Sequence, residues 1–434
     1  MSQPLPAGSS AALDRVYRKI LWRIMPMVMV LWVVAWMDRT SIGFAKLGMN
    51  SAFKLTDAEF GLAAGIFSLG YLLFEVPSNL VLLRIGARKT LTRIALLWGL
   101  TCALTMFVAS PTMLTVLRFL LGAFEAGLFP GVIFYLTLWL PTERRATAVG
   151  MFASAAAIAG IVSGPLGGFL LTRFDGVAGI AGWQWVFLIE GVLSIAFGIA
   201  TWFVLTDKVA DAMWLSEAER TEIAADLARD ANLLGARQHS VWEAARNPAA
   251  WLLCVIFSCT TMGYVVIAFF GPTILREAGI ADANVIGWIL SGISVATVIA
   301  MIATGVTSGR AKESRIHFLV ATAGAIAGMV LLGFAVPGNT ALVIVALFVF
   351  SVCAGTAIAV FWGLPPRLFA GTAVAVAIAF ISSVSNIGNF FAPTIMGSLK
   401  QSTGSVAAGA WILAAAYLLS LLLTWLFVRQ RAAA

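Results

Sequence analysis

The chain has 434 residues, of which 61% are hydrophobic and only 11% charged, whereas an ordinary soluble domain carries roughly 25% charged residues. Apolar runs of about 20 residues recur along it, and each is long enough to cross a hydrocarbon layer of about 30 Å. This composition excludes a water-soluble protein and predicts an all-α membrane protein surrounded by lipid. The net charge of +8 then needs an explanation other than binding to nucleic acid.

Twelve apolar spans are predicted in chain order. A polar tail at 1–19 lacks the apolar core of a removable signal peptide, and six spans follow within 20–206. A charged interval at 207–247 precedes six further spans within 248–428 and a tail at 429–434. The hydropathy pattern places the spans at 20–40, 58–81, 91–110, 112–139, 147–171, 184–206, 248–274, 284–308, 316–336, 340–363, 372–397 and 406–428.

The interval 207–247 is expected to be a linker on the membrane surface. Within it, DAMWLSEAERTEIAADLARD places Glu219 three residues after Ser216. This spacing is typical of a capping box and predicts the start of a short amphipathic helix.

Features of the first six spans recur about 228 residues later. Pro165 in the fifth span has a counterpart in Pro393 of the eleventh, and the basic connection at 84–93 has one at 309–315. A repeat of this kind predicts twelve transmembrane helices in two pseudo-symmetric six-helix bundles, with a binding cavity between the halves at mid-membrane.

The positive charge lies on one side of this arrangement. Of the 28 Lys and Arg residues, 21 fall in the termini and connections on the same side or, like Arg23, within four residues of them. By the positive-inside rule both termini are expected to be cytoplasmic. The excess of positive charge therefore indicates how the protein is oriented in the membrane, and no nucleic-acid partner is expected.

Charged residues inside the spans are the candidates for function. All charged residues of the spans belong to the first half. Arg23, Glu59 and Arg93 lie within four residues of the start of their spans, and the candidates are the other six: Asp38, Arg39, Glu75, Arg118, Glu125 and Glu190. An ionised side chain at a helix centre costs about 2.5 to 3.5 kcal/mol, so these groups are expected to face the bundle interior or a cavity. Arg118 and Glu125 are seven residues apart and share a helix face, but about 10.5 Å of rise separates them. Each therefore needs a partner on another helix, for which Asp38 and Arg39 are candidates.

The types of charge suggest transport of an anion. Two arginines, Arg39 and Arg118, can hold a carboxylate by charge-assisted hydrogen bonds, and two carboxyl groups, Asp38 and Glu125, can take up and release protons. The alternative is an interhelical ion pair that only locks the bundle. For Glu75, toward the cytoplasmic end of its span, and Glu190, near the outer end, we expect a structural or gating contact.

The second half offers neutral groups. Ser382, Asn386 and Asn389 form a polar stripe on the eleventh span. Phe361 and Trp362 lie at the end of the tenth span. These residues are candidates for substrate recognition. The alternatives are helix-helix contact for the stripe and core or interfacial packing for the two aromatic residues.

No catalytic or metal site is predicted. The four cysteines, Cys102, Cys254, Cys259 and Cys353, fall in apolar spans without metal-ligand spacing and are expected to be small packing residues. His239 and His317 have no nucleophile-base arrangement around them. We therefore expect no enzyme activity, no cofactor and no bound metal.

Several segments resemble the anion:cation symporter family of the major facilitator superfamily, over about 14–428. They are WMDRTSIGFA (36–45), FEVPSN (74–79) with RIGARK (84–89), RFLLGAFEAGLFPGVIFYLTLWLP (118–141), GWQWVFLIEG (182–191) and FWGLPPRLFAGTA (361–373). The resemblance implies proton carriage by Asp38 and Glu125, and substrate or gating roles for Arg39 and Arg118. It also implies substrate contact by Tyr71. Trp36 of the first motif is a further candidate for substrate binding, and Arg84, Arg88, Pro165 and Pro393 are candidates for structural or gating roles.

The sequence departs from the family in two places that concern the substrate and the gate. A fifth-span glutamine of the sugar-acid carriers is absent, with Ala156 near its place, which favours an aromatic or short hydroxy carboxylate over a polyhydroxylated sugar acid. The connection 84–93 lacks the acidic residue that is usual in the superfamily, so its role as a lock between helices is in question.

The leading hypothesis is a proton-coupled importer of a small organic carboxylate in a bacterial inner membrane, with protons and lipid as its other partners. No obligate protein partner is inferred. The alternatives are an organic-anion exporter or exchanger on the same fold, and a membrane receptor that binds without transporting.

Overall fold

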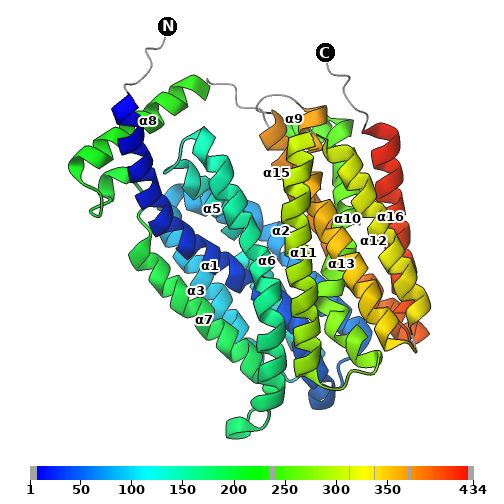
Figure 1. The fold of residues 1–434 in the computed structure, drawn as a ribbon. Coiled ribbons are helices and arrows are strands. Elements are labelled where there is room, and N and C mark those ends of the chain that lie inside the picture. The colour runs from blue at the N-terminus through cyan, green and yellow to red at the C-terminus, as the bar shows by residue number, and fades with distance from the viewer. Residues whose placement is uncertain (1–6, 235–240, 312, 337, 370–372, 429–434) are drawn as a thin grey trace.

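A computed structural model describes residues 7–234, 241–311, 313–336, 338–369 and 373–428. Within them, twelve helices are long and apolar enough to cross a membrane. They form two six-helix bundles, the first drawn in blue to green and the second in green to red (Figure 1). The predicted fold class is therefore confirmed. The predicted tail at 429–434 lies outside the described residues.

The first half consists of α1 (Ala7–Phe53), α2 (Asp57–Ile85), α3 (Ala87–Leu104), α4 (Pro111–Glu125), α5 (Leu128–Thr137), α6 (Thr142–Arg173) and α7 (Gly182–Val204), with short 3-10 turns at Thr105–Phe107 and Val177–Gly179. The linker contains a 3-10 turn (Val209–Asp211), α8 (Glu217–Leu234) and α9 (Val241–Arg246). The second half consists of α10 (Pro248–Glu277), α11 (Ala283–Ala311), α12 (Ser314–Ala335), α13 (Thr340–Phe361), α14 (Pro365–Leu368), α15 (Ala373–Thr403) and α16 (Ala407–Phe427).

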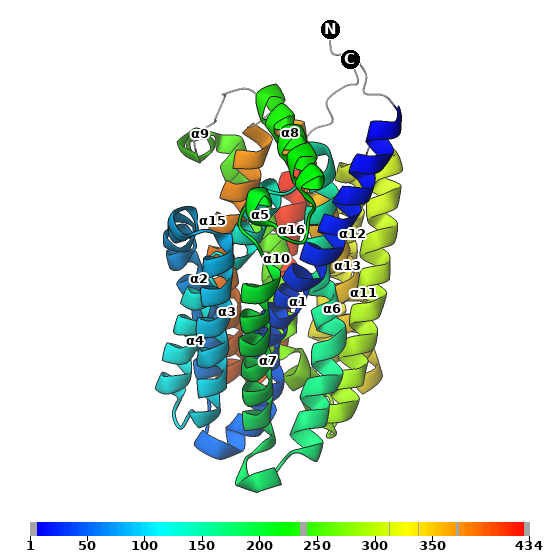
Figure 2. The ribbon, with the colours of Figure 1, turned by 90° about the vertical axis from the view of Figure 1, so that its left-hand side faces the viewer.

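α1 begins on the same face of the molecule on which α16 ends, and α8 lies across this face (Figure 2). We call it the terminal face and the other one the opposite face. α1 is helical from Ala7, so residues 7–19 of the predicted N-terminal tail form the first turns of this helix. Tyr17 explains this extension, because it is buried and its hydroxyl donates to Asp226 of α8 at 2.6 Å.

The capping box predicted for α8 is confirmed. The backbone N–H of Glu219 donates to Ser216 Oγ at 3.2 Å, and that of Ser216 donates to the Glu219 carboxylate at 2.7 Å. This backbone hydrogen bond, together with Lys19 at 2.9 Å, lowers the pKa of Glu219. α8 is thus attached to the terminal end of the first half.

The two halves pack against each other most closely toward the opposite face, through α2 with α15 and α6 with α11. A Cβ atom on Gly61 of α2 would lie 2.4 Å from the carbonyl oxygen of Pro393, and one on Gly164 of α6 would lie 2.4 Å from that of Gly287. Only glycine permits such an approach of two backbones. The two prolines that the repeat singled out, Pro165 and Pro393, therefore lie at the two helix crossings that join the halves.

Candidate functional site

Arg39 and Glu125 form an ion pair between α1 and α4. Arg39 Nε and Nη2 both donate to Glu125 Oε1, at 2.9 and 2.5 Å. The Glu125 side chain is fully buried, whereas that of Arg39 is 16% exposed. Four aromatic rings lie 5.0 to 5.4 Å from the guanidinium carbon of Arg39, those of Trp32, Trp36, Phe67 and Tyr71. The structure thus brings together four of the predicted site residues, Trp36, Arg39, Tyr71 and Glu125, in what we call the Arg39 cage.

Glu125 lies at a break in its transmembrane span. α4 ends at Glu125 and α5 begins at Leu128, because Gly127 has φ +90° in the left-handed region. A Cβ atom at Gly127 would also lie 2.6 Å from Ser78 Oγ of α2. The sequence analysis predicted one uninterrupted span at 112–139 and missed this break. The signal for it was the glycine directly after the glutamate and alanine, with Pro130 in the next turn.

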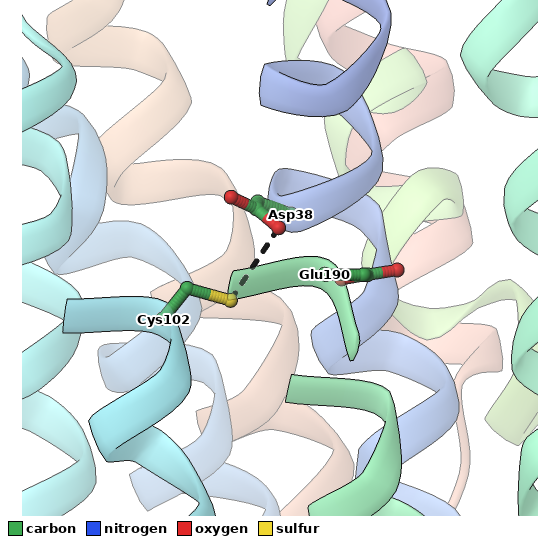
Figure 3. A group of neighbouring side chains, drawn as sticks. All are labelled: Asp38, Cys102 and Glu190. Carbon is green, nitrogen blue, oxygen red and sulfur yellow. Dashed lines mark hydrogen bonds between the residues drawn. The ribbon is translucent and has the colours of Figure 1, made fainter. Parts of the chain in front are cut away.

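Asp38 lies in a second buried group beside the cage, which we call the Asp38 cluster (Figure 3). Its carboxylate accepts hydrogen bonds from Trp98 Nε1, from Ser194 Oγ at 3.3 Å and from Cys102 Sγ at 3.4 Å. Glu190 of α7 belongs to the same cluster, and its Oε1 accepts from Ser41 Oγ. Asp38 and Glu190 are both 1% exposed.

Glu190 lies two turns inside α7, in the half of the helix toward the opposite face, and next to Asp38. We expected Cys102 to be a packing residue, but its thiol also donates to a carboxylate. Sequence spacing could not show either contact, because the three residues come from three different helices.

Asp38, Cys102 and Glu190 are also the residues that could hold a metal ion, since their ligand atoms lie within 4.8 Å of one another. Both oxygens of Asp38 and one of Glu190 already accept hydrogen bonds from the protein. Of the carboxylate oxygens in this cluster, only Glu190 Oε2 has no hydrogen-bond donor among the described residues. The arrangement is therefore one of carboxylates held by protein donors, and it supplies no independent sign of a cation.

Arg118 lies deeper than Arg39. It is 1% exposed, and its Nη1 donates to the backbone carbonyl of Asp38 at 3.3 Å rather than to a carboxylate. Its Nε and Nη2 have no hydrogen-bond acceptor among the described residues. The predicted arrangement of Asp38, Arg39, Arg118 and Glu125 around one region is thus observed, but only the Arg39 and Glu125 side chains pair directly.

A cavity of about 100 Å³ lies between the halves next to the cage. Trp36, whose ring contacts Arg39, forms part of its wall together with Thr40 and Phe44 of the same helix. The rest of the wall comes from α6, α10, α11 and α13, and includes Ala156, Tyr264, Leu290, Ser294, Thr297 and Met301. The sequence analysis did not single out the second-half residues of this wall.

Three of the six hydroxyl groups in the described wall are bonded to their own helix. Thr40 Oγ1 donates to the carbonyl of Trp36, Ser294 Oγ to that of Leu290 and Thr297 Oγ1 to that of Ile293. Hydroxyls bonded to their own helix present little hydrogen-bonding capacity to a ligand. The described wall contains no charged side chain, so the cavity is uncharged and has a guanidinium beside it.

The other predicted binding residues of the second half lie apart from this cavity wall. Phe361 is buried at the end of α13, where its ring stacks on Phe257 with 4.4 Å between centroids, and Trp362 contacts the same ring at 4.7 Å. Both belong to a separate hydrophobic core of the second half. Their observed contacts are those of packing.

The polar stripe on α15 bonds largely to itself. Asn386 Nδ2 donates to the Ser382 carbonyl at 3.3 Å, and Asn389 Nδ2 donates to Asn386 Oδ1 at 3.4 Å. Asn389 Oδ1 is buried without a donor among the described residues. α15 packs on α2 of the other half, so the stripe lies on a helix of the interface.

Glu75 makes a contact between the halves, because its Oε2 accepts a hydrogen bond from Ser383 of α15 at 3.1 Å. Arg84 is exposed in the last turn of α2. Arg88 is bound within the first half: its backbone N–H donates to Asp207 at 2.7 Å, and its guanidinium lies 4.4 Å from the Trp202 ring. The 84–93 connection is thus held within the first half by Asp207.

The sequence analysis also missed a group of four charged residues on the opposite face, Lys46, Asp57, Glu277 and Lys400, which we call the Asp57 cluster. Asp57 is the first residue of α2, Lys46 lies in α1, and the other two lie at the ends of α10 and α15.

Comparison with known proteins agrees with the fold. Residues 28–376 match the Major Facilitator Superfamily family model. The chain is 38% identical over 406 residues to the metabolite transport protein NicT of Pseudomonas putida, with 93% of this chain and 92% of that one covered. It is 36% identical over 417 residues to a protein of Agrobacterium vitis named as a tartrate transporter, with 96% and 92% covered.

Among solved structures, the xylose transporter XylE of E. coli in a partially occluded inward open conformation aligns with a TM-score of 0.76 at 13% identity, over 94% of this chain and 98% of that chain. This likeness concerns the fold alone, whereas the family model and the two relatives concern the sequence over most of its length. The chain belongs to the major facilitator superfamily of membrane transporters.

Proposed function

We propose that this protein is a symporter that carries a small organic carboxylate together with protons by alternating access between its two halves. The observation that carries the proposal is the Arg39–Glu125 ion pair. One partner is fully buried and the other is 16% exposed beside a cavity between the halves. An arginine in this position can release the Glu125 carboxylate and bind the carboxylate of a substrate in the cavity instead.

The coupling follows from competition for one guanidinium. Arg39 donates through Nε and Nη2, and both donate to Glu125 Oε1. A substrate carboxylate that takes these two donors leaves Glu125 buried without a cation. Glu125 then takes up a proton from water, since an unpaired carboxylate is costly in a dry interior. When the substrate leaves, the proton leaves with it and the ion pair forms again.

The Asp38 cluster supports this exchange from the other side of α1. Trp98, Cys102 and Ser194 hold the Asp38 carboxylate in place, and Arg118 holds its backbone carbonyl. We assign Asp38 a second proton-carrying role and Glu190 a supporting one. We assign Arg118 the role of a second cation that can bind a carboxylate, because its Nε and Nη2 have no acceptor among the described residues.

The cavity favours a substrate with an apolar body. Its described wall has no charge, and several of its hydroxyls are bonded to their own helices. A sugar acid would lose its hydration there without gaining equivalent hydrogen bonds, which is costly. An aromatic or short hydroxy carboxylate, with its single anionic group on Arg39, fits this chemistry better.

The two relatives support an organic metabolite as substrate, because one is named as a metabolite transport protein and the other as a tartrate transporter. We place the protein in the bacterial inner membrane with the terminal face toward the cytoplasm, since the connections rich in Lys and Arg lie on that face. Import is the direction that a proton gradient would drive in this orientation. We assign it to the anion:cation symporter family.

The test is uptake into proteoliposomes of known orientation. Benzoate, hydroxybenzoate, tartrate and gluconate are offered in turn with the outside at lower pH than the inside. We expect accumulation of at least one aromatic or hydroxy acid above the level in protein-free liposomes, which neutral weak acids enter unaided, and loss of this excess when the pH difference is abolished. Accumulation that ignores the proton gradient, or counterflow without any net accumulation, would point instead to an exchanger or exporter on this fold.

A further inference from the structure

The Asp57 cluster joins both halves on the opposite face. Asp57 Oδ1 accepts from Lys46 Nζ, and Asp57 Oδ2 accepts from Lys400 Nζ at 2.5 Å. Lys400 Nζ also lies 2.7 Å from Glu277 Oε1. The side chains of Lys46 and Lys400 are only 1% and 9% exposed, so these charges depend on each other rather than on water.

Only one of the three ion pairs connects the halves. Lys46 and Asp57 both belong to the first half, whereas Lys400 and Glu277 both belong to the second. If the Asp57–Lys400 pair breaks, each half therefore keeps a neutral pair of its own. This matters because a buried charge that loses its only partner is strongly destabilising. The cluster is arranged so that the bridge between the halves can open without leaving such a charge.

The packing around the cluster closes the face tightly. A Cβ atom at Gly397 would lie 2.2 Å from the Asp57 carbonyl oxygen, and Gln401 Oε1 accepts from the backbone N–H of Ala58 at 3.1 Å. Lys46 Nζ lies 4.4 Å from the Phe60 ring of its own half and 4.9 Å from the Phe270 ring of the other. Opening this face must therefore separate α2 from α15 at Asp57.

We propose that the Asp57–Lys400 ion pair is a reversible latch that holds the opposite face closed, and that Lys46 and Glu277 are the partners that keep each half neutral when the latch opens. The proposal goes beyond the proposed function, because it needs only two halves that separate on this face and no particular substrate or coupling ion.

The latch can be tested by the distance between two spin labels. Ala52 at the end of α1 and Ser402 at the end of α15 are both exposed and lie in opposite halves. Labels on cysteines introduced at these two positions report the separation of the halves in the full chain in lipid nanodiscs. Because the four native cysteines are buried or half-buried, a sample without the introduced pair serves to detect any labelling of them.

Two substitutions should act in opposite directions. Asp57→Asn removes the charge that binds Lys400 and should enrich the long-distance population at least fivefold. Glu277→Gln removes the partner that Lys400 would retain on opening and should deplete that population. Lys54→Asn, at an exposed neighbour with left-handed backbone that asparagine tolerates, should leave it unchanged.

An unchanged distance distribution in Asp57→Asn, or enrichment of the long distance by Glu277→Gln to the same extent, would refute the latch. If Asp57→Asn does not yield folded protein, judged by its thermal unfolding, Lys400→Met replaces it with the same expected enrichment. The measurement requires neither substrate nor a proton gradient, so a failure of the symport proposal would not affect it.

Discussion

Arg39 binds Glu125 through two nitrogens to a single oxygen, at 2.9 and 2.5 Å, and leaves Glu125 Oε2 without a hydrogen-bond donor among the described residues. A bidentate arrangement that used both carboxylate oxygens would be stronger. The observed arrangement neutralises the buried glutamate but leaves one of its two oxygens without a hydrogen-bond donor among the described residues. Such a pair can yield its guanidinium to a competing carboxylate, which is what a coupling site requires.

Glu125→Gln should abolish proton-driven accumulation while exchange of substrate across the membrane persists. The amide has nearly the shape of the carboxyl group but cannot carry a proton, so substrate binding and proton uptake become separate. Proteoliposome uptake with and without a pH difference, followed by counterflow, measures the two activities. Glu143→Gln, at an exposed glutamate in the first turn of α6, is the matched control. Full accumulation by Glu125→Gln would remove Glu125 from the coupling role.

Arg39→Lys should weaken carboxylate binding although the positive charge remains. Lysine cannot present two fixed N–H groups to a carboxylate, and loss of one charge-assisted hydrogen bond of about 1.5 to 3 kcal/mol corresponds to roughly a 10- to 150-fold weaker affinity. The ligand-dependent rise in melting temperature, measured over a range of carboxylate concentrations, gives the affinity. Arg84→Lys, exposed at the end of α2, should bind like the parent. Equal affinity in Arg39→Lys would mean that the substrate does not contact this guanidinium.

The sequence predicted the spans and the meeting of charges because both depend on the cost of placing polar groups in lipid. Arg118 and Glu125 share a helix face but stand too far apart to pair, so partners on another helix were required, and both are found on α1. The individual partners are not determined by the sequence. Glu125 pairs with Arg39, whereas Arg118 donates to a backbone carbonyl. The rotation and depth of each helix decide this, and both are set by its packing against other helices rather than by the spacing of residues within it.

The parts that sequence could not give are those where several helices converge. Asp38, Cys102 and Glu190 come from α1, α3 and α7, and nothing in any one of these segments indicates the other two. Lys46 and Lys400 lie near span ends, where positive residues usually reach water. Their burial depends on Asp57 and Glu277 closing over them from two different helices.

Trp98→Phe should destabilise the protein and disturb Asp38 in particular. The indole Nε1 donates to the Asp38 carboxylate, and both residues are at most 1% exposed. Loss of a donor to a buried charged group costs about 1 to 3 kcal/mol. Thermal unfolding and the pH dependence of uptake should both change. Trp425→Phe, at a 59% exposed position of α16, should change neither, and a shift of melting temperature without any change in the pH profile would limit Trp98 to a packing role.

Gly127→Ala should damage transport out of proportion to the size of the change. Gly127 has φ +90°, which costs an alanine about 1 to 3 kcal/mol, and the new Cβ would lie 2.6 Å from Ser78 Oγ. Either α5 shifts away from α2 or the break closes, and in both cases Glu125, two residues earlier, moves relative to Arg39. Gly150→Ala is the control, because Gly150 is helical and a Cβ there meets nothing within 4 Å. Normal substrate affinity together with uncoupled uptake in Gly127→Ala would show that the helix break positions Glu125. Coupling equal to that of the parent would show that Arg39 and Glu125 pair without the break.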